Sequence, residues 1–362
     1  AFGKDALGAN STGNFCTAVG KDALRDNTTA EHNTAVGHDA LQANTTGTQN
    51  VAVGSAALDA NTTANNNTAV GYNSLGTNIS GANNTALGSH ALFTNTASFN
   101  TAVGQDALRL NTSGASNTAL GRQALYANTT GAQNTAVGSG ALDANTTALD
   151  NTAVGYNALT SITTGQNCTA VGSKALEDNT GSDNTGLGYQ ALANNTSGND
   201  NTAVGRNALR VSTTAGHNTA VGNEALGENT TGSNNVAVGS EALDANQTGS
   251  NNTAVGYQAL TTNTATNNTA FGYQALRLNT SGTSNVAVGL QSLNVNVNGS
   301  ENTVCGHQAL DANTSGSVNT AVGSFSLGAN TTGNNNVALG SRALEANTTG
   351  GNNVAIGRSA MA

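Results

Sequence analysis

The chain has 362 residues, with 11 Lys and Arg, 20 Asp and Glu, and a formal net charge of −9. Cations this sparse argue against a nucleic-acid partner, because phosphate binding needs clustered Lys and Arg. No apolar run reaches membrane-spanning length, and a chain with 3% aromatic residues and no Trp or Pro would be typical of disorder unless a strict repeat imposed order.

A strict repeat fills the chain. One unit of 17 residues, close to Asn-Thr-Ala-Val-Gly-x-x-Ala-Leu-x-x-Asn-Thr-Thr-Gly-x-x, occurs 22 times if a partial first copy is counted. We number positions in the unit from its first Asn. The uniform composition offers no boundary, so residues 1–362 are predicted to form one continuous array. The chain begins and ends inside a unit, and we therefore expect a processed product or a part of a longer protein.

Each unit is predicted to form one turn of a parallel β-solenoid, an all-β fold of about 22 coils, because it has several short segments and no helix-period apolar stripe. Three units, which start at Asn84, Cys168 and Asn252, are one residue short, and the deletion falls in the Thr-Thr-Gly segment. A corner tolerates this loss, whereas in a strand it would exchange the buried and exposed side chains.

The first segment of the unit is predicted to be a strand whose side chains alternate between two faces. Position 4 is always apolar and position 2 is always Thr or Val, so we expect these side chains, including Val36 and Val53, to fill the core. Position 3, nearly always Ala, would then point outward. We infer from this that the column of Ala35, Ala52, Ala69 and their equivalents packs against another chain.

The rest of the unit supplies corners and a second core residue. Position 5 is always Gly, as at Gly37, Gly54, Gly71 and Gly104, which predicts a corner with positive φ or a close backbone approach. Position 9 is Leu in every unit but the last, so Leu41, Leu58 and their equivalents are predicted core residues. Asn at position 12 is predicted to stack into a ladder of amide hydrogen bonds between coils.

Four stretches carry a resemblance to a known family. They are residues 50–54, 235–239, 285–289 and 353–357, which read Val-Ala-Val-Gly or Val-Ala-Ile-Gly after the first Asn. The pattern resembles the head repeat of YadA-like trimeric autotransporter adhesins, and related repeats occur in the shafts of bacteriophage tail fibres. The resemblance implies a left-handed parallel β-roll, three chains packed side by side, extracellular display and adhesion. The units here are longer than the typical head repeat, and Thr mostly replaces its first Val.

Catalytic and metal-binding patterns are absent from the sequence. His32 and His38 form the only close histidine pair, with Glu31 and Asp39 beside them, and we expect solvated charges there in place of a metal site. Carboxylates at positions 7 and 10 are too sparse for a calcium-binding repeat and are interpreted as solvated. The three cysteines lie too far apart for an intrachain disulfide. The sequence thus predicts no enzyme, no cofactor, no metal and no catalytic residue.

An aromatic row is the most informative surface feature. Tyrosine occupies position 6, directly after the Gly, at Tyr72, Tyr156, Tyr189, Tyr257 and Tyr273. Stacking of coils would place these side chains on one edge, where Tyr suits contact with a sugar or a protein. The alternatives are a tyrosine that covers a seam between chains and a simple exposed corner.

The sequence therefore favours a non-enzymatic fibrous rod, a structural spacer and adhesive surface of a phage tail fibre or bacterial adhesin, located on a cell or virion surface. Its expected partners are two further copies in a trimer and a cell-surface glycan or protein receptor, with no membrane insertion by this segment. One alternative is an extracellular filament of chains stacked head to tail. The other is an ice-binding solenoid, motivated by the Thr residues at positions 13 and 14.

Overall fold

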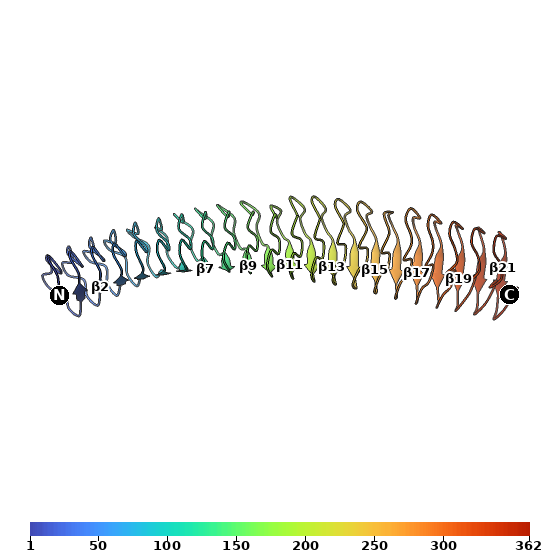
Figure 1. Cartoon of the computed structure of the whole chain (residues 1–362), viewed down its shortest axis with the longest axis horizontal. Coiled ribbons are helices and arrows are strands. Elements are labelled where there is room, and N and C mark those ends of the chain that lie inside the picture. Colours follow the sequence, from blue (N-terminus) through green and yellow to red (C-terminus); the bar gives the residue numbers. More distant parts are fainter. The chain divides into compact units, whose positions relative to one another are not determined.

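The computed structural model describes residues 1–362 as two compact units, Ala1–Thr180 and Gly181–Ala362. Within each unit, successive coils lie side by side and every coil contributes one short strand (Figure 1). The fold is an all-β parallel β-solenoid of about 20 turns with a 17-residue repeat. This confirms the predicted all-β solenoid and its repeat length, while the number of turns is slightly smaller than the expected 22. The structure contains no helix long and apolar enough to span a membrane.

Every strand has three residues, from position 2 to position 4 of its repeat. The first unit contains β1 Thr17–Val19, β2 Thr34–Val36, β3 Val51–Val53, β4 Thr68–Val70, β5 Thr85–Leu87, β6 Thr101–Val103, β7 Thr118–Leu120, β8 Thr135–Val137, β9 Thr152–Val154 and β10 Thr169–Val171. The second unit contains β11 Thr185–Leu187, β12 Thr202–Val204, β13 Thr219–Val221, β14 Val236–Val238, β15 Thr253–Val255, β16 Thr269–Phe271, β17 Val286–Val288, β18 Thr303–Cys305, β19 Thr320–Val322, β20 Val337–Leu339 and β21 Val354–Ile356. The partial first copy adds only a parallel bridge between Phe2 and Val19.

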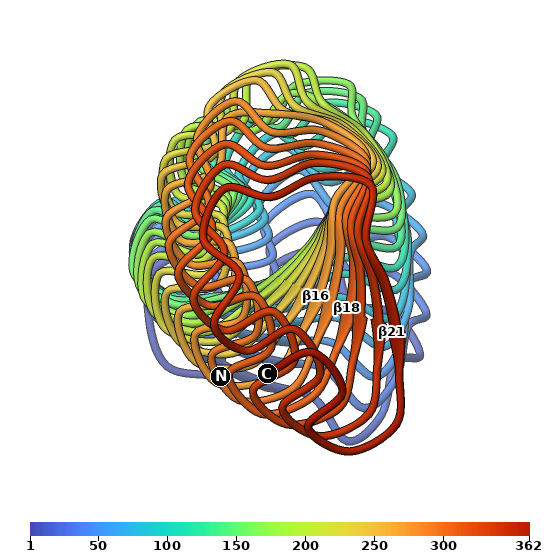
Figure 2. The same ribbon diagram turned by 90° about the vertical axis from the view of Figure 1, so that its right-hand side faces the viewer.

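Neighbouring strands within a unit pair in parallel and in register, so each position of the repeat forms a column. Figure 2 shows β16, β18 and β21 along one side of the coil. The register survives the shortened units: Thr85 pairs with Thr101, and Thr253 pairs with Thr269. These two deletions therefore lie outside the strand, as predicted.

The inward face of the strand is the opposite of the one predicted. Ala35 and Ala52 at position 3 are completely buried, whereas Val36 and Val53 at position 4 are only half-buried and point outward. The assignment of Val36 and Val53 to the core was wrong, and so was the packing of the Ala column against another chain. The interior already holds the buried Leu and Asn side chains of the same coil, so the inward strand position is nearly always occupied by Ala, with Val304 as the one larger residue.

The other predicted core column is placed as expected. Leu41 and Leu58 at position 9 are completely buried, and both adopt a left-handed backbone with φ of 54°. The small residues at position 8, such as Ala40 and Ala57, are also completely buried. Leu at position 9 and the Ala columns at positions 3 and 8 thus make up the apolar part of the core.

The glycine corners show both features that the sequence predicted as alternatives, a positive φ and a close approach of the backbone. Gly37, Gly54, Gly71 and Gly104 have φ between 133° and 143°. A Cβ atom on Gly54 would stand 2.6 Å from the carbonyl oxygen of Gly71 in the next coil. Position 5 therefore needs glycine both for its φ and for the closeness of consecutive coils.

Two buried asparagine columns link the coils. At position 12, Asn44 Nδ2 donates to Asn27 Oδ1 at 3.0 Å, and Asn61 Nδ2 donates to Asn44 Oδ1 at 2.9 Å, which confirms the predicted amide ladder. At position 1, the backbone N–H of Asn50 donates to Asn33 Oδ1 at 2.9 Å, and Asn50 Nδ2 donates to the Ala64 carbonyl. These bonds satisfy polar groups that would otherwise be costly to bury.

Candidate interaction surfaces

Neither unit contains a pocket. The candidate sites are therefore groups of side chains on the coils. They are the outward face of the strands, the tyrosine edge with the glutamines beside it, a cluster of ionisable groups near the N-terminus, and the aspartates at position 10.

The outward face of the strands, here called the Thr/Val face, consists of the side chains at positions 2 and 4 of β1–β10 in the first unit and of β11–β21 in the second. Leu87 and Leu120 are each 46% exposed and Phe271 is 42% exposed. No strand carries a charged side chain at either position. A contiguous exposed stripe of apolar and Thr side chains is unusual for a surface that faces only water.

Sequence reasoning missed this face, although a signal for it was present. Position 4 varies in size among Val, Leu, Ile, Phe and Cys, whereas position 3 is Ala apart from Gly186 and Val304. A closely packed interior tolerates small changes of volume poorly. The column that varies in size is therefore the one that faces outward.

The five tyrosines at position 6 are all exposed, by 54% at Tyr72, 56% at Tyr156, 47% at Tyr189, 43% at Tyr257 and 46% at Tyr273. Only Tyr257 and Tyr273 contact one another, with ring centroids 5.5 Å apart and planes inclined by 24°. Tyr72 makes an edge-on contact with His90 at 5.2 Å instead. The structure thus assembles one tyrosine pair from the predicted row.

A row of glutamines lies beside that pair at position 7. Gln258 Nε2 donates to Glu241 Oε2 at 2.6 Å, and Gln274 Nε2 donates to Gln258 Oε1 at 2.9 Å. Gln291 Nε2 donates to Gln274 Oε1 at 3.1 Å, and Gln308 Nε2 continues the row to Gln291 Oε1 at 3.2 Å. The sequence gives only a weak sign of this side-chain ladder, because Gln occurs at position 7 in only part of the chain.

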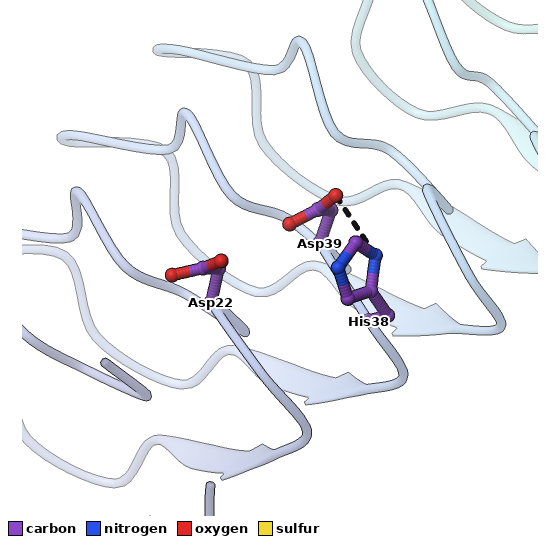
Figure 3. Close-up of side chains that lie close together, drawn as sticks. All are labelled: Asp22, His38 and Asp39. Carbon is purple, nitrogen blue, oxygen red and sulfur yellow. Dashed lines mark ion pairs between the residues drawn. The ribbon is translucent and has the colours of Figure 1, made fainter. Parts of the chain in front are cut away.

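Asp22, His38 and Asp39 approach one another across two coils of the first unit, with one potential ligand atom each within 4.8 Å of the others (Figure 3). His38 Nδ1 lies 2.9 Å from Asp39 Oδ2. Lys21 Nζ lies 2.9 Å from Asp22 Oδ2, and this hydrogen bond lowers the pKa of Asp22. Because both carboxylates already have basic partners, we assign no metal site to this cluster.

The histidine pair singled out in the sequence is divided between different contacts. His32 stacks on Phe15, with ring centroids 4.9 Å apart, while His38 joins the cluster with Asp39 and Asp22. None of the three cysteines, Cys16, Cys168 and Cys305, is joined to another by a disulfide, and Cys305 is exposed on the Thr/Val face. The prediction that they form no intrachain disulfide is confirmed.

The aspartates at position 10 are less solvated than the sequence analysis expected. Burial raises the pKa of Asp59, Asp143 and Asp311. Burial also raises the pKa of Asp244, and repulsion from Glu224, Glu228 and Glu241 brings it to about 6. The interpretation of the position 10 carboxylates as solvated was therefore wrong in part, because these side chains are half-buried.

The comparisons with known proteins add no family to this description. No protein-family model matches the chain, and no curated protein matches it. What is established is the class, a parallel β-solenoid built from one repeat, with an exposed Thr/Val face and an aromatic edge.

Proposed function

We propose that the chain is a non-enzymatic fibre segment, a spacer with an adhesive surface, in which three copies pack side by side through the Thr/Val face. Such a segment would belong to a phage tail fibre or a bacterial surface adhesin and would lie outside the cell or on the virion. The observation that carries this proposal is the exposure of the apolar position 4 column on consecutive strands of each unit.

The Thr/Val face is well suited to packing against a copy of itself. Covering it would remove half-exposed Val and Leu side chains from water, at about 25 cal/mol per Å² of apolar surface. It carries no charge that would have to be desolvated. Each coil would contribute only a small gain, but the gains would add along many coils of the same register.

The proposed contact surface is the Thr/Val face, whereas the sequence had suggested the Ala column at position 3. The Ala column at position 3 is inside the coil, and it cannot touch another chain. A charged substitution there would disrupt the coil itself and would not report on assembly. The contact must therefore be tested at position 4.

The test replaces Val137, Val154 and Val171 together by Glu and measures mass in solution by light scattering. We expect three chains per particle for the wild type and one for the variant, with the β-sheet circular dichroism retained. A matched control replaces Thr130, Thr147 and Thr164, exposed corner residues, by Glu and should keep three chains. A wild-type mass of one chain, or a position 4 variant that still assembles, would sink the proposal. Open polymers that grow with concentration would favour head-to-tail stacking.

Ice binding is a second candidate, because one specific observation favours it. Thr at position 2 alternates with Val at position 4 on the outward side of a regular array of strands, which gives a hydroxyl and methyl pattern without charge. The Thr residues at position 13 are less suitable, since their hydroxyls donate to the next coil, as from Thr45 Oγ1 to the Thr62 carbonyl at 3.0 Å. A single-chain mass together with thermal hysteresis, lost in the position 4 variant, would replace the fibre proposal by this one.

A further inference from the structure

Four consecutive coils of the second unit form a surface that departs from the rest of the repeat. We call it the Tyr–Gln edge and define it as Tyr257, Tyr273, Leu290 and His307 at position 6, with Gln258, Gln274, Gln291 and Gln308 at position 7. All four side chains at position 6 are exposed. In most other coils position 6 is Ser, Lys, Arg or another polar aliphatic residue, so the repeat does not by itself require this row of ring and apolar side chains.

The glutamine row leaves hydrogen-bonding capacity at every coil. Each Gln amide has two N–H donors and two acceptor lone pairs. The ladder uses one N–H of Gln258, Gln274, Gln291 and Gln308, and one Oε1 contact on all but the last. A donor and an acceptor thus remain beside each side chain of position 6, and the ladder holds them in fixed orientations.

Part of the backbone of this edge is already paired between successive coils. The N–H of Gln274 donates to the Tyr257 carbonyl, and the N–H of Gln291 donates to the Tyr273 carbonyl, both at 2.9 Å. The N–H of Gln308 similarly donates to the Leu290 carbonyl at 3.0 Å. An extended peptide would bind by adding a strand to free backbone groups, and these N–H and carbonyl groups are already bonded to the neighbouring coil.

We propose that the Tyr–Gln edge binds an uncharged glycan that extends across successive coils. Neutral sugars combine apolar C–H faces with closely spaced hydroxyls, and they match a surface of ring carbons, phenol groups and amides. Positions 6 and 7 of these coils carry no Lys, Arg, Asp or Glu. The Tyr257–Tyr273 contact and the amide ladder hold the side chains in place, which lowers the entropy lost on binding.

The repetition of the edge adds to its affinity. A linear glycan could engage one Tyr or Leu and one Gln per coil, and simultaneous contacts strengthen one another through effective concentration. The inference deepens the adhesive part of the proposed function by naming the class of ligand. It does not depend on the side-by-side packing, since a single chain would display the same edge.

The test measures the migration of the full-length chain in native gels cast with a soluble polysaccharide. The probes are laminarin, dextran, galactomannan and xyloglucan as neutral chains, and alginate as an anionic chain. One variant carries Tyr257→Ser and Tyr273→Ser, and a second carries Gln274→Leu and Gln291→Leu. Ser occupies position 6 naturally, as at Ser55 and Ser89, so the first variant is expected to fold. The matched control, Tyr72→Ser with Tyr156→Ser, removes two tyrosines that lack a Gln row.

We expect at least one neutral polysaccharide to retard the wild type, with at least about tenfold weaker binding by both edge variants and no change in the control. Alginate should have no effect. The inference fails if none of the neutral chains retards the protein, if alginate retards it equally, or if the control loses as much as the edge variants. It also fails if the tyrosine variant changes the mass in solution, because the edge would then lie between copies. If a polysaccharide retards the wild type but its mass in solution is that of one chain, the packing proposal is refuted and the glycan inference stands.

Discussion

At the residue scale, the backbone conformation explains why position 9 holds Leu, although Val or Ile would be equally hydrophobic. Most coils place non-glycine residues in the left-handed region at positions 7, 9 and 17, as at Ala56, Leu58 and Asn66 with φ of 53°, 54° and 60°. This conformation costs about 1–2 kcal/mol per residue and is least accessible to β-branched side chains. Position 9 accordingly holds Leu or Met and never Val or Ile.

We predict that Leu159→Ile destabilises the chain much more than Leu159→Met. Leu159 is completely buried, with φ of 53°. The Ile variant should lose about 2 kcal/mol or more because of backbone strain, whereas a volume-conserving swap to Met should cost less than about 1.5 kcal/mol. Urea unfolding monitored by circular dichroism measures the difference. Equal losses would show that strain at position 9 is unimportant.

The raised pKa of Asp244 predicts a local dependence of stability on pH. The folded state holds the proton more tightly than the unfolded chain, whose carboxyl has its usual pKa of 3.8. The stability of wild type should therefore fall as the pH rises from about 4 to about 6 and change little above that range.

Asp244→Asn removes the ionisable group, and we expect a higher melting temperature than wild type at pH 7 and a smaller difference at pH 4. Asp143→Asn is the matched comparison, because burial alone raises the pKa of Asp143. It should give a smaller gain, since no neighbouring carboxylate adds to the effect. An Asp244→Asn gain that is the same at both pH values would contradict the proton-linked explanation.

At the scale of the element, the amide ladder is the device that joins one coil to the next. Asn128 Nδ2 donates to Asn111 Oδ1, and Asn145 Nδ2 donates to Asn128 Oδ1, both at 2.7 Å. The ladder is interrupted at the next coil, where Ile162 occupies the Asn position and Asn145 Oδ1 is buried without a partner. An orphaned buried acceptor costs about 1–3 kcal/mol.

We predict that Ile162→Asn leaves stability unchanged or raises it by up to about 1 kcal/mol, because the restored donor offsets the lost apolar burial. This is contrary to the usual result of placing an amide in a core. The reverse change, Asn128→Ile, should lose about 1–3 kcal/mol, because it removes the donor to Asn111 Oδ1. Chemical denaturation of both variants provides the measurement, and a large loss in Ile162→Asn would show that the ladder contributes little to the stability of the coils.

At the scale of the whole molecule, we expect assembly and ligand binding to depend on the repeated surfaces of the coils more than on any single site. Within each unit, most coils contact their neighbours through strand, corner and amide ladder, so stability is approximately a sum over coils and their interfaces. The same regularity repeats an exposed side chain at every turn. Assembly and ligand binding are therefore expected to draw on columns of residues.

The exposed thiol of Cys305 allows this assembly to be probed directly, because it replaces Val on the Thr/Val face. In a chain carrying Cys16→Ser and Cys168→Ala, we expect a short bismaleimide to link Cys305 of different copies, with a yield that does not depend on protein concentration. The additional change Cys305→Ser should abolish the product. Absence of cross-linking, or a yield that rises steadily with concentration, would contradict side-by-side packing through this face.

The amino-acid sequence was sufficient to predict the solenoid, the length of its turn, the glycine corners, the Leu column and the Asn ladder. Each of these follows from a residue type that recurs at one position, because stacking in register converts a repeat into a column. It also indicated which segment could absorb the shortened units, since a strand cannot lose a residue without exchanging its faces.

The inward side of the strand, in contrast, could be assigned only from the folded coil. Alternation fixes that positions 2 and 4 share a face, but it does not say whether that face is inside. Closure of a narrow coil around Leu and two Asn side chains leaves room for the Ala column and turns Val36 and Val53 outward. The pairing of Tyr257 with Tyr273 and the partial burial of Asp244 likewise depend on where the turns bring side chains together.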